Sequence, residues 1–316
     1  DIPELILELR RRLAKEQGQP AVQKAIFGVV NNRRLFHGML RAASVAQKPF
    51  AQQGFIRHLP FFLSNLTGSR SLPAIAEEPL RDTVRRIPQP EATERAALYA
   101  GCLLDFAYPG TGEAVVKILN RAGIRVIFPE GQTCCGAPAR YSGAYEVAAR
   151  NAKDNLDALL AEDVRWIVSA CPTCTVALKQ EFEATLESVG ETAWLERARA
   201  VAAKTVDFST LVARLVEEGR LTLPEGKRLS QLTYHDSCHL RRTLRATEAP
   251  RRLLGEAGHE VVEMFESDMC CGMGGSYSVK LPEISAPMLK RKLDNIRKTG
   301  APLVATDCPG CVMQLR

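Results

Sequence analysis

The chain has 316 residues, of which 46% are apolar and 25% are charged, and its formal net charge is +6. This composition is typical of a folded protein with more than one domain, and it excludes a disordered or collagen-like chain. The sequence contains no apolar run of the roughly eighteen residues that a membrane span needs, and it does not open on a signal-peptide pattern. We therefore expect a cytoplasmic protein.

The positive charge is concentrated near the N-terminus. Residues 1–86 hold fourteen Lys and Arg against seven Asp and Glu. We interpret the arginine runs in this segment as solvated helix faces, with a docking surface for an acidic partner or for the inner membrane as the alternative. No nucleic-acid partner is expected, because aromatic residues make up only 6% of the chain and no recognition motif accompanies the charge. These runs are Arg10-Arg11-Arg12, Arg33-Arg34 and Arg85-Arg86.

Residues 1–90 are expected to form a helical and irregular segment. Pro3 and Glu4 are typical of the first turn of a helix, and the helical pattern continues to about residue 47. Six prolines between residues 48 and 90 break any longer helix. We place a domain boundary after this connector.

From residue 95 onward, short β-type runs alternate with helical stretches. The first series predicts strands at 96–100, 125–128 and 165–170, helices at 114–122 and 146–160, and a helix capped by Asp207. The second series predicts strands at 232–234, 260–265 and 302–306, and helices at 251–257 and 283–297. The alternation predicts an α/β fold with two tandem modules, residues 95–225 and 228–316, each with a mostly parallel sheet covered by helices.

All ten cysteines take part in this repeat. The first five are Cys102, Cys134, Cys135, Cys171 and Cys174; the second five, at an offset of 136 or 137 residues, are Cys238, Cys270, Cys271, Cys308 and Cys311. Each follows a predicted strand, and the carboxyl ends of parallel strands meet at one edge of a sheet. We therefore predict two compact groups of five sulfurs, one in each module, that line one cleft between the modules.

Five cysteines exceed the four thiolates that a zinc ion or a cubane iron–sulfur cluster takes. Five thiolates on one zinc ion would also leave a charge of about −3 in a partly dry site. The pattern favours a polynuclear iron–sulfur cluster in each module, with zinc or buried metal-free cysteines as the alternatives. Gly136 and Gly272 follow the cysteine pairs and allow close approach of backbone N–H groups to sulfur.

Histidines and a few other polar residues lie near the second group. His235 and His239 flank Cys238 and are candidate catalytic residues that could hydrogen-bond a cluster sulfur or move a proton, although both also fit an ordinary polar loop. Tyr277 and Lys280 are candidates for anchoring a carboxylate substrate, and packing and solvation explain them equally well. No flavin or nicotinamide fingerprint is present. Two further histidines, His37 and His58, are expected on the surface.

These motifs resemble those of a known family. Residues 128–136 (FPEGQTCCG), 234–239 (YHDSCH) and 270–285, which begin with CCG, are similar to lactate utilisation protein A, a group within the CCG cysteine-rich domain family. That family includes the catalytic subunit of heterodisulfide reductase and the iron–sulfur subunit of glycolate oxidase. Residues 1–88 resemble the C-terminal tail of lactate utilisation protein B, a ferredoxin-type protein, so the chain resembles part of a fused B–A polypeptide.

The resemblance implies one noncubane 4Fe-4S cluster in each module, bound by the ten cysteines. It implies an iron–sulfur oxidoreductase component that oxidises L-lactate to pyruvate and passes electrons to a quinone or another carrier. The implied partners are other lactate utilisation subunits, the ferredoxin-type domain upstream, a 2-hydroxy acid substrate, and a quinone-linked or peripheral membrane protein. Disulfide reduction, glycolate oxidation and a zinc-binding assembly scaffold stay open as alternatives.

Overall fold

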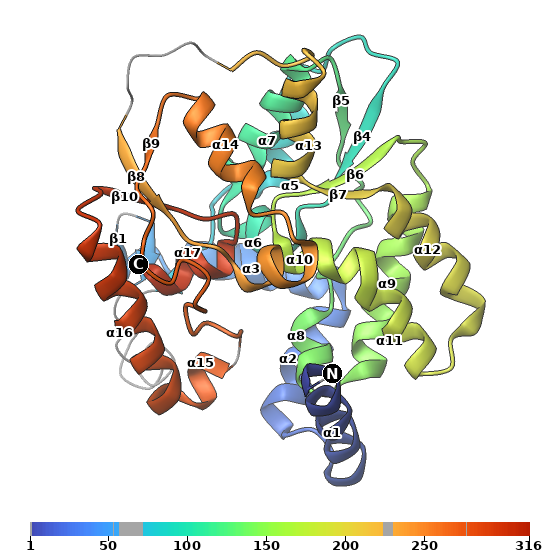
Figure 1. Cartoon of the computed structure of the whole chain (residues 1–316). Helices are drawn as coiled ribbons and strands as arrows, with labels where there is room; N and C mark the ends of the chain where they lie inside the picture. Colours follow the sequence, from blue (N-terminus) through green and yellow to red (C-terminus); the bar gives the residue numbers. More distant parts are fainter. Residues whose placement is uncertain (1, 53, 57–71, 224–229, 276) are drawn as a thin grey trace.

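The computed structural model describes residues 2–52, 54–56, 72–223, 230–275 and 277–316. Figure 1 shows the N-terminal helices in blue, a first module in green to yellow, and a second module in orange to red beside it. The α/β fold with two related modules is confirmed, whereas the exact domain bounds stay a prediction. Among the described residues, no helix combines the length and the apolar character that crossing a membrane requires.

The N-terminal segment is helical, as predicted, but it forms three helices: α1 (Ile2–Gln17), α2 (Ala21–Asn31) and α3 (Arg33–Ala46). Pro20 precedes α2, and the Asn32 side chain accepts a hydrogen bond from the Leu35 N–H at 3.1 Å, which caps α3. A small antiparallel sheet and one helical turn occupy the described part of the connector. Their bounds are β1 (Ala51–Gln52), β2 (Phe55–Ile56), β3 (Leu72–Pro73), α5 (Leu80–Thr83) and a 3-10 turn (Val84–Arg86).

The arginine runs are solvated as expected, except for the half-buried Arg11, and some of them also contact the first module: Arg10 donates to the Tyr141 carbonyl at 3.0 Å, and Arg11 donates to the Ser188 carbonyl. The expectation for His37 needs correction. His37 is half-buried, because its ring packs 5.1 Å from that of Phe106, and this burial lowers its pKa to about 4. His58 lies outside the described residues.

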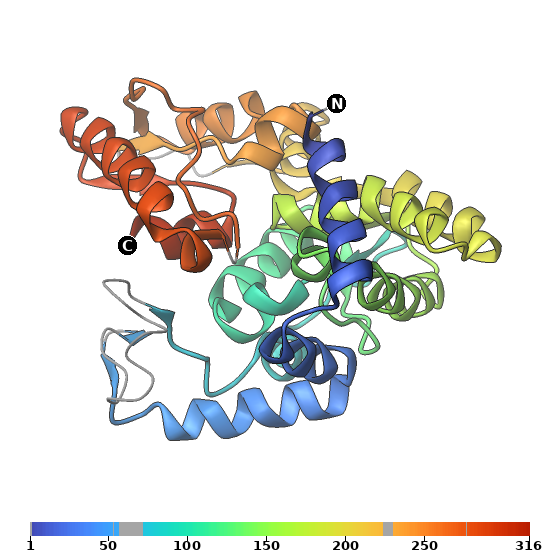
Figure 2. The ribbon, with the colours of Figure 1, turned by 90° about the horizontal axis from the view of Figure 1, so that it is seen from below.

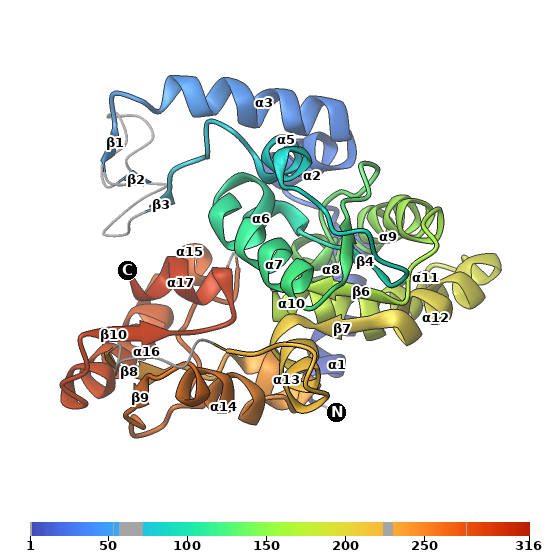
Figure 3. The same cartoon turned by 90° about the horizontal axis from the view of Figure 1, so that it is seen from above.

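The first module is built on a four-stranded parallel sheet in the order β5-β4-β6-β7. Its strands are β4 (Arg95–Leu98), β5 (Arg125–Ile127), β6 (Trp166–Ser169) and β7 (Thr205–Asp207). Ala96 pairs with Val126 on one side and Trp166 on the other. Figure 3 shows α7 (Pro109–Arg121) and α13 (Phe208–Glu217) on one face, and α9 (Tyr145–Leu160) and α12 (Leu195–Lys204) on the other.

The second module repeats this topology with three parallel strands in the order β10-β8-β9. The strands are β8 (Gln231–Tyr234), β9 (Glu260–Val261) and β10 (Leu303–Ala305), and the helices that correspond to α7 and α9 are α14 (Glu248–Glu256) and α16 (Pro282–Lys298). The first strand of each module is central and its two successors flank it, so the duplication inferred from the cysteine spacing is present in the sheets. Strand β9 is shorter than the predicted 260–265, because the chain leaves the sheet after Val262.

Sequence reasoning missed several elements. Strand β7 has only three residues, and it ends at Asp207, whose side chain also caps α13 by accepting from the Thr210 N–H at 3.0 Å. The stretch 177–204 holds a π-helical turn (Ala177–Glu181), α11 (Phe182–Ser188), a 3-10 turn (Thr192–Trp194) and α12. Short helices also begin beside the cysteines: α6 (Gly101–Phe106), α8 (Ala137–Tyr141), α10 (Pro172–Val176), α15 (Tyr277–Lys280) and α17 (Pro309–Leu315), together with a π-helical stretch (His239–Leu244).

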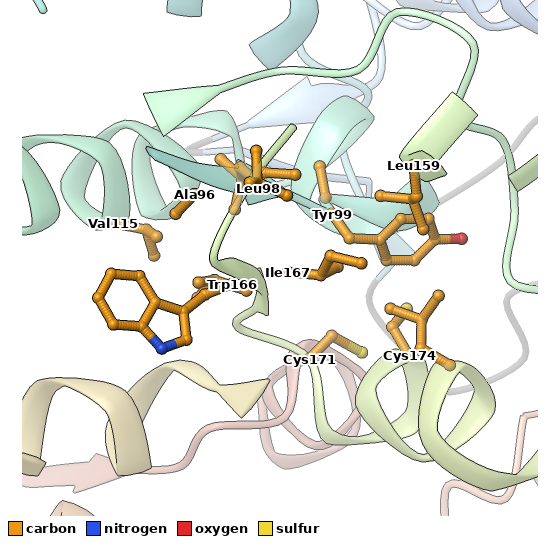
Figure 4. Packing of buried hydrophobic residues seen from close by; sticks show 14 of the residues in the cluster. Ala96, Leu98, Tyr99, Val115, Leu159, Trp166, Ile167, Cys171 and Cys174 are labelled. Atoms are coloured by element: carbon orange, nitrogen blue, oxygen red, sulfur yellow. The ribbon is translucent and has the colours of Figure 1, made fainter. Parts of the chain in front are cut away.

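The main hydrophobic core lies around the first sheet and extends to its cysteines. All four residues of β6 are buried, and Leu98, Leu156 and Ile167 are among the fully buried side chains. Figure 4 shows Cys171 and Cys174 on the side of the core next to Ile167 and Tyr99. Burial of these apolar side chains stabilises the sheet, and with it the edge from which the cysteines project.

Candidate functional site

The first group of cysteines lies beyond the carboxyl ends of β4, β5 and β6. Cys102 is in the first turn of α6, and the pair Cys134-Cys135 ends the loop between β5 and α8. Cys171 is the N-cap of α10, Pro172 is its first residue, and Cys174 follows on the same turn. Because proline has no N–H group to satisfy at a helix start, this Cys-Pro sequence begins a helix directly after a strand.

The second group has the same local structures. Cys238 follows β8, Cys270 and Cys271 lie in the loop between β9 and α15, and Cys308 is the N-cap of α17 with proline as its first helical residue. The backbone angles of the two N-caps are similar, with φ −136° and ψ 108° at Cys171 and φ −102° and ψ 111° at Cys308. The two modules therefore present their cysteines on the same kind of scaffold.

Within each group, the five thiols form one continuous chain of sulfur–sulfur contacts. The order is Cys102–Cys134–Cys135–Cys174–Cys171 in the first site and Cys238–Cys270–Cys271–Cys311–Cys308 in the second. The Cys271 and Cys311 sulfurs are 3.4 Å apart. All ten cysteines are free thiols. The structure thus brings the sulfurs together in two groups, one from each module, as the sequence predicts.

One thiol of each cysteine pair is poised to ionise. Hydrogen bonds from Cys102 and Cys135 hold the pKa of Cys134 well below its usual value. The corresponding contacts from Cys238 and Cys271 lower the pKa of Cys270 to about 2, and the thiol contact from Cys270 raises the pKa of Cys271 to about 12. Thiolates are the metal-binding form of cysteine, so each group offers at least one ready ligand.

Backbone N–H groups point at these sulfurs where a glycine follows each pair. The Gly272 N–H lies 3.4 Å from the Cys270 sulfur, and the Gly136 N–H interacts with Cys134 in the same way. Both glycines have left-handed φ, 76° at Gly136 and 84° at Gly272. A Cβ atom on Gly272 would come within 2.8 Å of the Ser285 carbonyl oxygen of α16. Glycine is therefore required by both the backbone angle and the close packing of the loop.

His235 is fully buried beside the second group. One of its ring nitrogens and the sulfurs of Cys271 and Cys311 lie within 4.8 Å of one another. Neither ring nitrogen has a hydrogen-bond partner of normal geometry among the described residues, although the Ser267 backbone favours its charged form. Burial lowers its pKa to about 4, so the imidazole is neutral at pH 7. This arrangement differs from the polar-loop alternative and leaves His235 free to contact a group held by the cysteines.

His239 lies between the two modules. Its Nδ1 is 4.0 Å from the Cys238 sulfur and 3.1 Å from the Thr173 hydroxyl, which belongs to the first group's Cys-Pro-Thr-Cys turn. Its Nε2 is 3.1 Å from the Tyr141 hydroxyl, and the two rings stack at 6.2 Å. One imidazole from the second module therefore contacts the loop of the first site, so the two sites adjoin where α10 meets the π-helical stretch (His239–Leu244).

The donor set fits a polynuclear metal–sulfur group. Each site supplies five sulfurs in mutual contact, one acidic thiol and backbone donors to sulfur, which is more than a single zinc ion takes. Next to the ligands in the sequence, the buried hydroxyls of Thr133 and Ser237 have no hydrogen-bond partner among the described residues. Buried polar atoms normally find partners, so these hydroxyls are available to a bound group.

Two residues that the sequence did not single out support the loops beneath the cysteine pairs. In α9, Asn155 donates to the Cys134 carbonyl at 3.0 Å and accepts from the Thr133 N–H at 2.8 Å. In α16, the fully buried Lys292 donates its Nζ to the carbonyls of Glu266, at 2.5 Å, and Ser267, at 3.2 Å. Their only signal in the sequence is a polar residue on the buried face of a predicted helix.

The prediction that both groups of cysteines line one cleft is not confirmed, because the nearby cavity has no cysteine in its lining. A cavity of about 330 Å³ lies where the N-terminal helices meet both modules, and Tyr277 and Lys280 line it together with Tyr141. Most of its lining residues belong to the N-terminal segment, and the others follow the two cysteine pairs. The two carboxylate-anchor candidates therefore line a cavity, and the ten candidate ligands do not.

Comparison with known proteins agrees with the repeat. The CCG family model, described as a cysteine-rich domain, matches residues 96–179 and again residues 232–316. Similar proteins include "Lactate utilization protein A" of Shouchella clausii, 36% identical over 221 residues, which are 69% of this chain and 89% of that protein. The proteins of the same name from Halalkalibacterium halodurans (35% identity, 70% of this chain, 88% of that protein) and Geobacillus thermodenitrificans (36%, 70% and 90%) are also similar.

Proposed function

The chain belongs to the CCG cysteine-rich domain family, in its lactate utilization protein A group, and from this premise we propose that it is an iron–sulfur component of an L-lactate-oxidising complex. A role in lactate utilisation follows from that membership. More specifically, we propose that each five-cysteine group binds one 4Fe-4S cluster of the noncubane type, and that electrons from lactate pass through these clusters. The main support for this cluster assignment is that the five cysteine sulfurs of each module contact one another.

Oxidation of L-lactate to pyruvate releases two electrons and two protons. A bound iron–sulfur cluster supplies one-electron redox chemistry, and two adjoining sites in one chain match the two electrons of the reaction. In this proposal the cysteines would hold the irons, the backbone N–H of Gly272 donates to the Cys270 sulfur, and burial keeps His235 neutral beside the second site. We propose that partner subunits, including a ferredoxin-type domain, carry the electrons onward.

Metal analysis is the first test. Protein purified without oxygen should contain iron and acid-labile sulfide for both sites. Replacing Cys134 and Cys135 by serine should remove about half of each, and so should replacing Cys270 and Cys271. The exposed substitution Glu196→Gln is the matched control and should change neither. Near-stoichiometric zinc with little iron would overturn the cluster assignment and favour an assembly scaffold.

Activity assays on the same preparation test which substrate the complex oxidises or reduces. The chain with its partner subunits should reduce an artificial acceptor with L-lactate, and either pair substitution should abolish that activity. Glycolate and a disulfide are assayed in parallel, because retention of all ten cysteines also resembles the disulfide-reducing relatives. Turnover of glycolate or of a disulfide without turnover of lactate would show that lactate is not the substrate.

A further inference from the structure

The cavity between the N-terminal helices and the two modules has walls from three separate parts of the chain. Residues of α1 and of the start of α2 form one side, Tyr141 and Ser142 of the first module form another, and the second module closes it with Gly274, Tyr277, Lys280 and Leu281. Figure 2 shows α1, in dark blue, crossing the face of the first module. The volume of about 330 Å³ is at the lower end of the range for small-molecule sites.

Cationic and uncharged side chains line this cavity. Arg10 and Lys280 contribute two positive charges, and no aspartate or glutamate is among the lining residues that the structure describes. Neither cation forms an ion pair with any part of the chain that the structure describes. Three glutamines and two tyrosines supply neutral hydrogen-bonding groups. Two cations outside any ion pair, with no acid among the other lining residues, make a site for an anion.

The packing of α1 gives Arg10 a defined position. One guanidinium nitrogen donates to the Tyr141 carbonyl at 3.0 Å, and Gln19 donates to the Ser142 carbonyl at 3.0 Å. The helix backbone lies so close to the first module that a Cβ atom on Gly143 would be 2.5 Å from the Arg10 carbonyl oxygen. The N-terminal segment is thus fixed against the loop that leads from the first cysteine pair.

The cavity is also connected to both cysteine sites. Tyr141 and Tyr277 are 136 residues apart, at corresponding positions after the two cysteine pairs. The Tyr141 hydroxyl donates to Glu181 at 2.8 Å and lies 3.1 Å from His239. His239 in turn contacts Thr173 of the first site and the Cys238 sulfur of the second. A ligand in contact with Tyr141 is therefore linked to both groups through two residues, Tyr141 and His239.

We propose that this cavity binds a small monocarboxylate, with its carboxylate between the Arg10 guanidinium and the Lys280 ammonium. The assignment of that carboxylate as the 2-hydroxy acid substrate rests on the proposed function. The N-terminal segment thereby contributes a binding residue to a site shared by both modules, so the modules alone lack half of its positive charge.

Equilibrium binding of L-lactate to the full chain, purified without oxygen, tests the proposal by calorimetry. Lys280→Gln and Arg10→Gln should each weaken binding by about tenfold, because each removes one charge-assisted hydrogen bond, whereas Arg10→Lys keeps the charge and should retain most of the affinity. The matched controls are Arg12→Gln on α1 and Lys290→Gln on α16, both exposed and outside the cavity, and each should change affinity less than twofold. Lys280 is exposed on a short helix, so its substitution leaves the fold intact.

Unchanged affinity in Lys280→Gln and Arg10→Gln would overturn the cavity assignment, even if the complex oxidises lactate with an unchanged KM. Binding of inorganic phosphate with the same dependence on both cations, without binding of L-lactate, would overturn the monocarboxylate class. Conversely, acetate or pyruvate binding that depends on both cations supports the cavity, even if lactate is not oxidised and the proposed function fails. The two proposals can therefore fail separately.

Discussion

The two cysteine sites share a backbone scaffold but differ in the residues that surround the sulfurs. Their central strands, N-cap cysteines and left-handed glycines correspond. Gly136 packs on Ala148 and Gly272 packs on Ser285, so α9 and α16 correspond at an offset of 137 residues. At this offset, the neutral Asn155 of the first site corresponds to the positively charged Lys292 of the second.

Other charged and polar positions differ in the same comparison. The buried Tyr99, whose hydroxyl donates to the Thr133 carbonyl at 2.7 Å, corresponds to His235 in the second module. Asp307 precedes Cys308 where the first module has Ala170; burial raises its pKa, and Ser209 donates to it at 2.6 Å. The duplicated scaffold thus sets the arrangement of the sulfurs, while single residues beneath the loops set the local charge.

The sites also differ in how they are joined to the core. Cys135, Cys171 and Cys174 belong to the main hydrophobic cluster, whereas Cys271, Cys308 and Cys311 form a small cluster of their own. Strand β6 is covered on both edges by β4 and β7, whereas β10 pairs only with β8 among the described residues, and Leu303 is 52% exposed. We therefore expect metal binding at the first site to be coupled more tightly to folding than at the second.

The largest expected effect tests this coupling. Cys135→Ser should lower the melting temperature of the full chain by about 8 °C and Cys271→Ser by about 3 °C, because only the first change removes a ligand from the main core. Thermal unfolding followed by circular dichroism measures the difference, with iron content checked for both variants. An equal fall in melting temperature would show that the two sites are coupled to folding to the same extent.

The second prediction concerns the two left-handed glycines. Gly272→Ala should destabilise the protein by about 3 kcal/mol and Gly136→Ala by about 2 kcal/mol, since the added Cβ would meet a carbonyl oxygen at 2.8 Å in the former and the Ala148 Cα at 3.1 Å in the latter. Gly219 is a matched control, because its φ is 68° and its Cβ position is open. Denaturant unfolding should give about 1 kcal/mol for Gly219→Ala. A similar loss of unfolding free energy at all three positions would refute the role of close packing.

The smallest expected effect concerns the charge of the second site. Lys292→Met should lower the reduction potential of that site's cluster by about 60 mV, because removal of a buried positive charge disfavours the reduced state. The first site, with Asn155 at the corresponding position, should keep its potential and serves as the internal reference. An anaerobic redox titration followed by electron paramagnetic resonance measures both.

Two controls sharpen this test. Lys292→Arg keeps the charge and should shift the potential little, and Arg291→Gln removes an exposed charge from the same helix, where its side chain is 62% exposed. A shift of both clusters together, or no shift in Lys292→Met, would contradict the assignment of local charge to Lys292.

The sequence predicted the parts of the molecule that depend on local pattern. The alternation of β-type and helical runs predicted the α/β class, and the offset of the ten cysteines predicted two modules with separate groups of sulfurs. It missed β7 and the short helices beside the cysteines, because elements of three to seven residues have too few apolar positions for a recognisable period. It also placed His37 on the surface and missed the contacts of Arg10 and Arg11 with the first module, because a sequence does not show which partner a helix face meets.

The amino-acid sequence by itself therefore determined the number of sites, the identity of their sulfurs and the strands that carry them, since these follow from spacing along the chain. Only the tertiary structure decided that α1 lies against the loop after the first cysteine pair, that His239 crosses from one module to the other, and that Asn155 and Lys292 occupy corresponding places. The physical reason is that these contacts join segments as much as 131 residues apart, and their distances depend on the packing of whole elements rather than on any local preference.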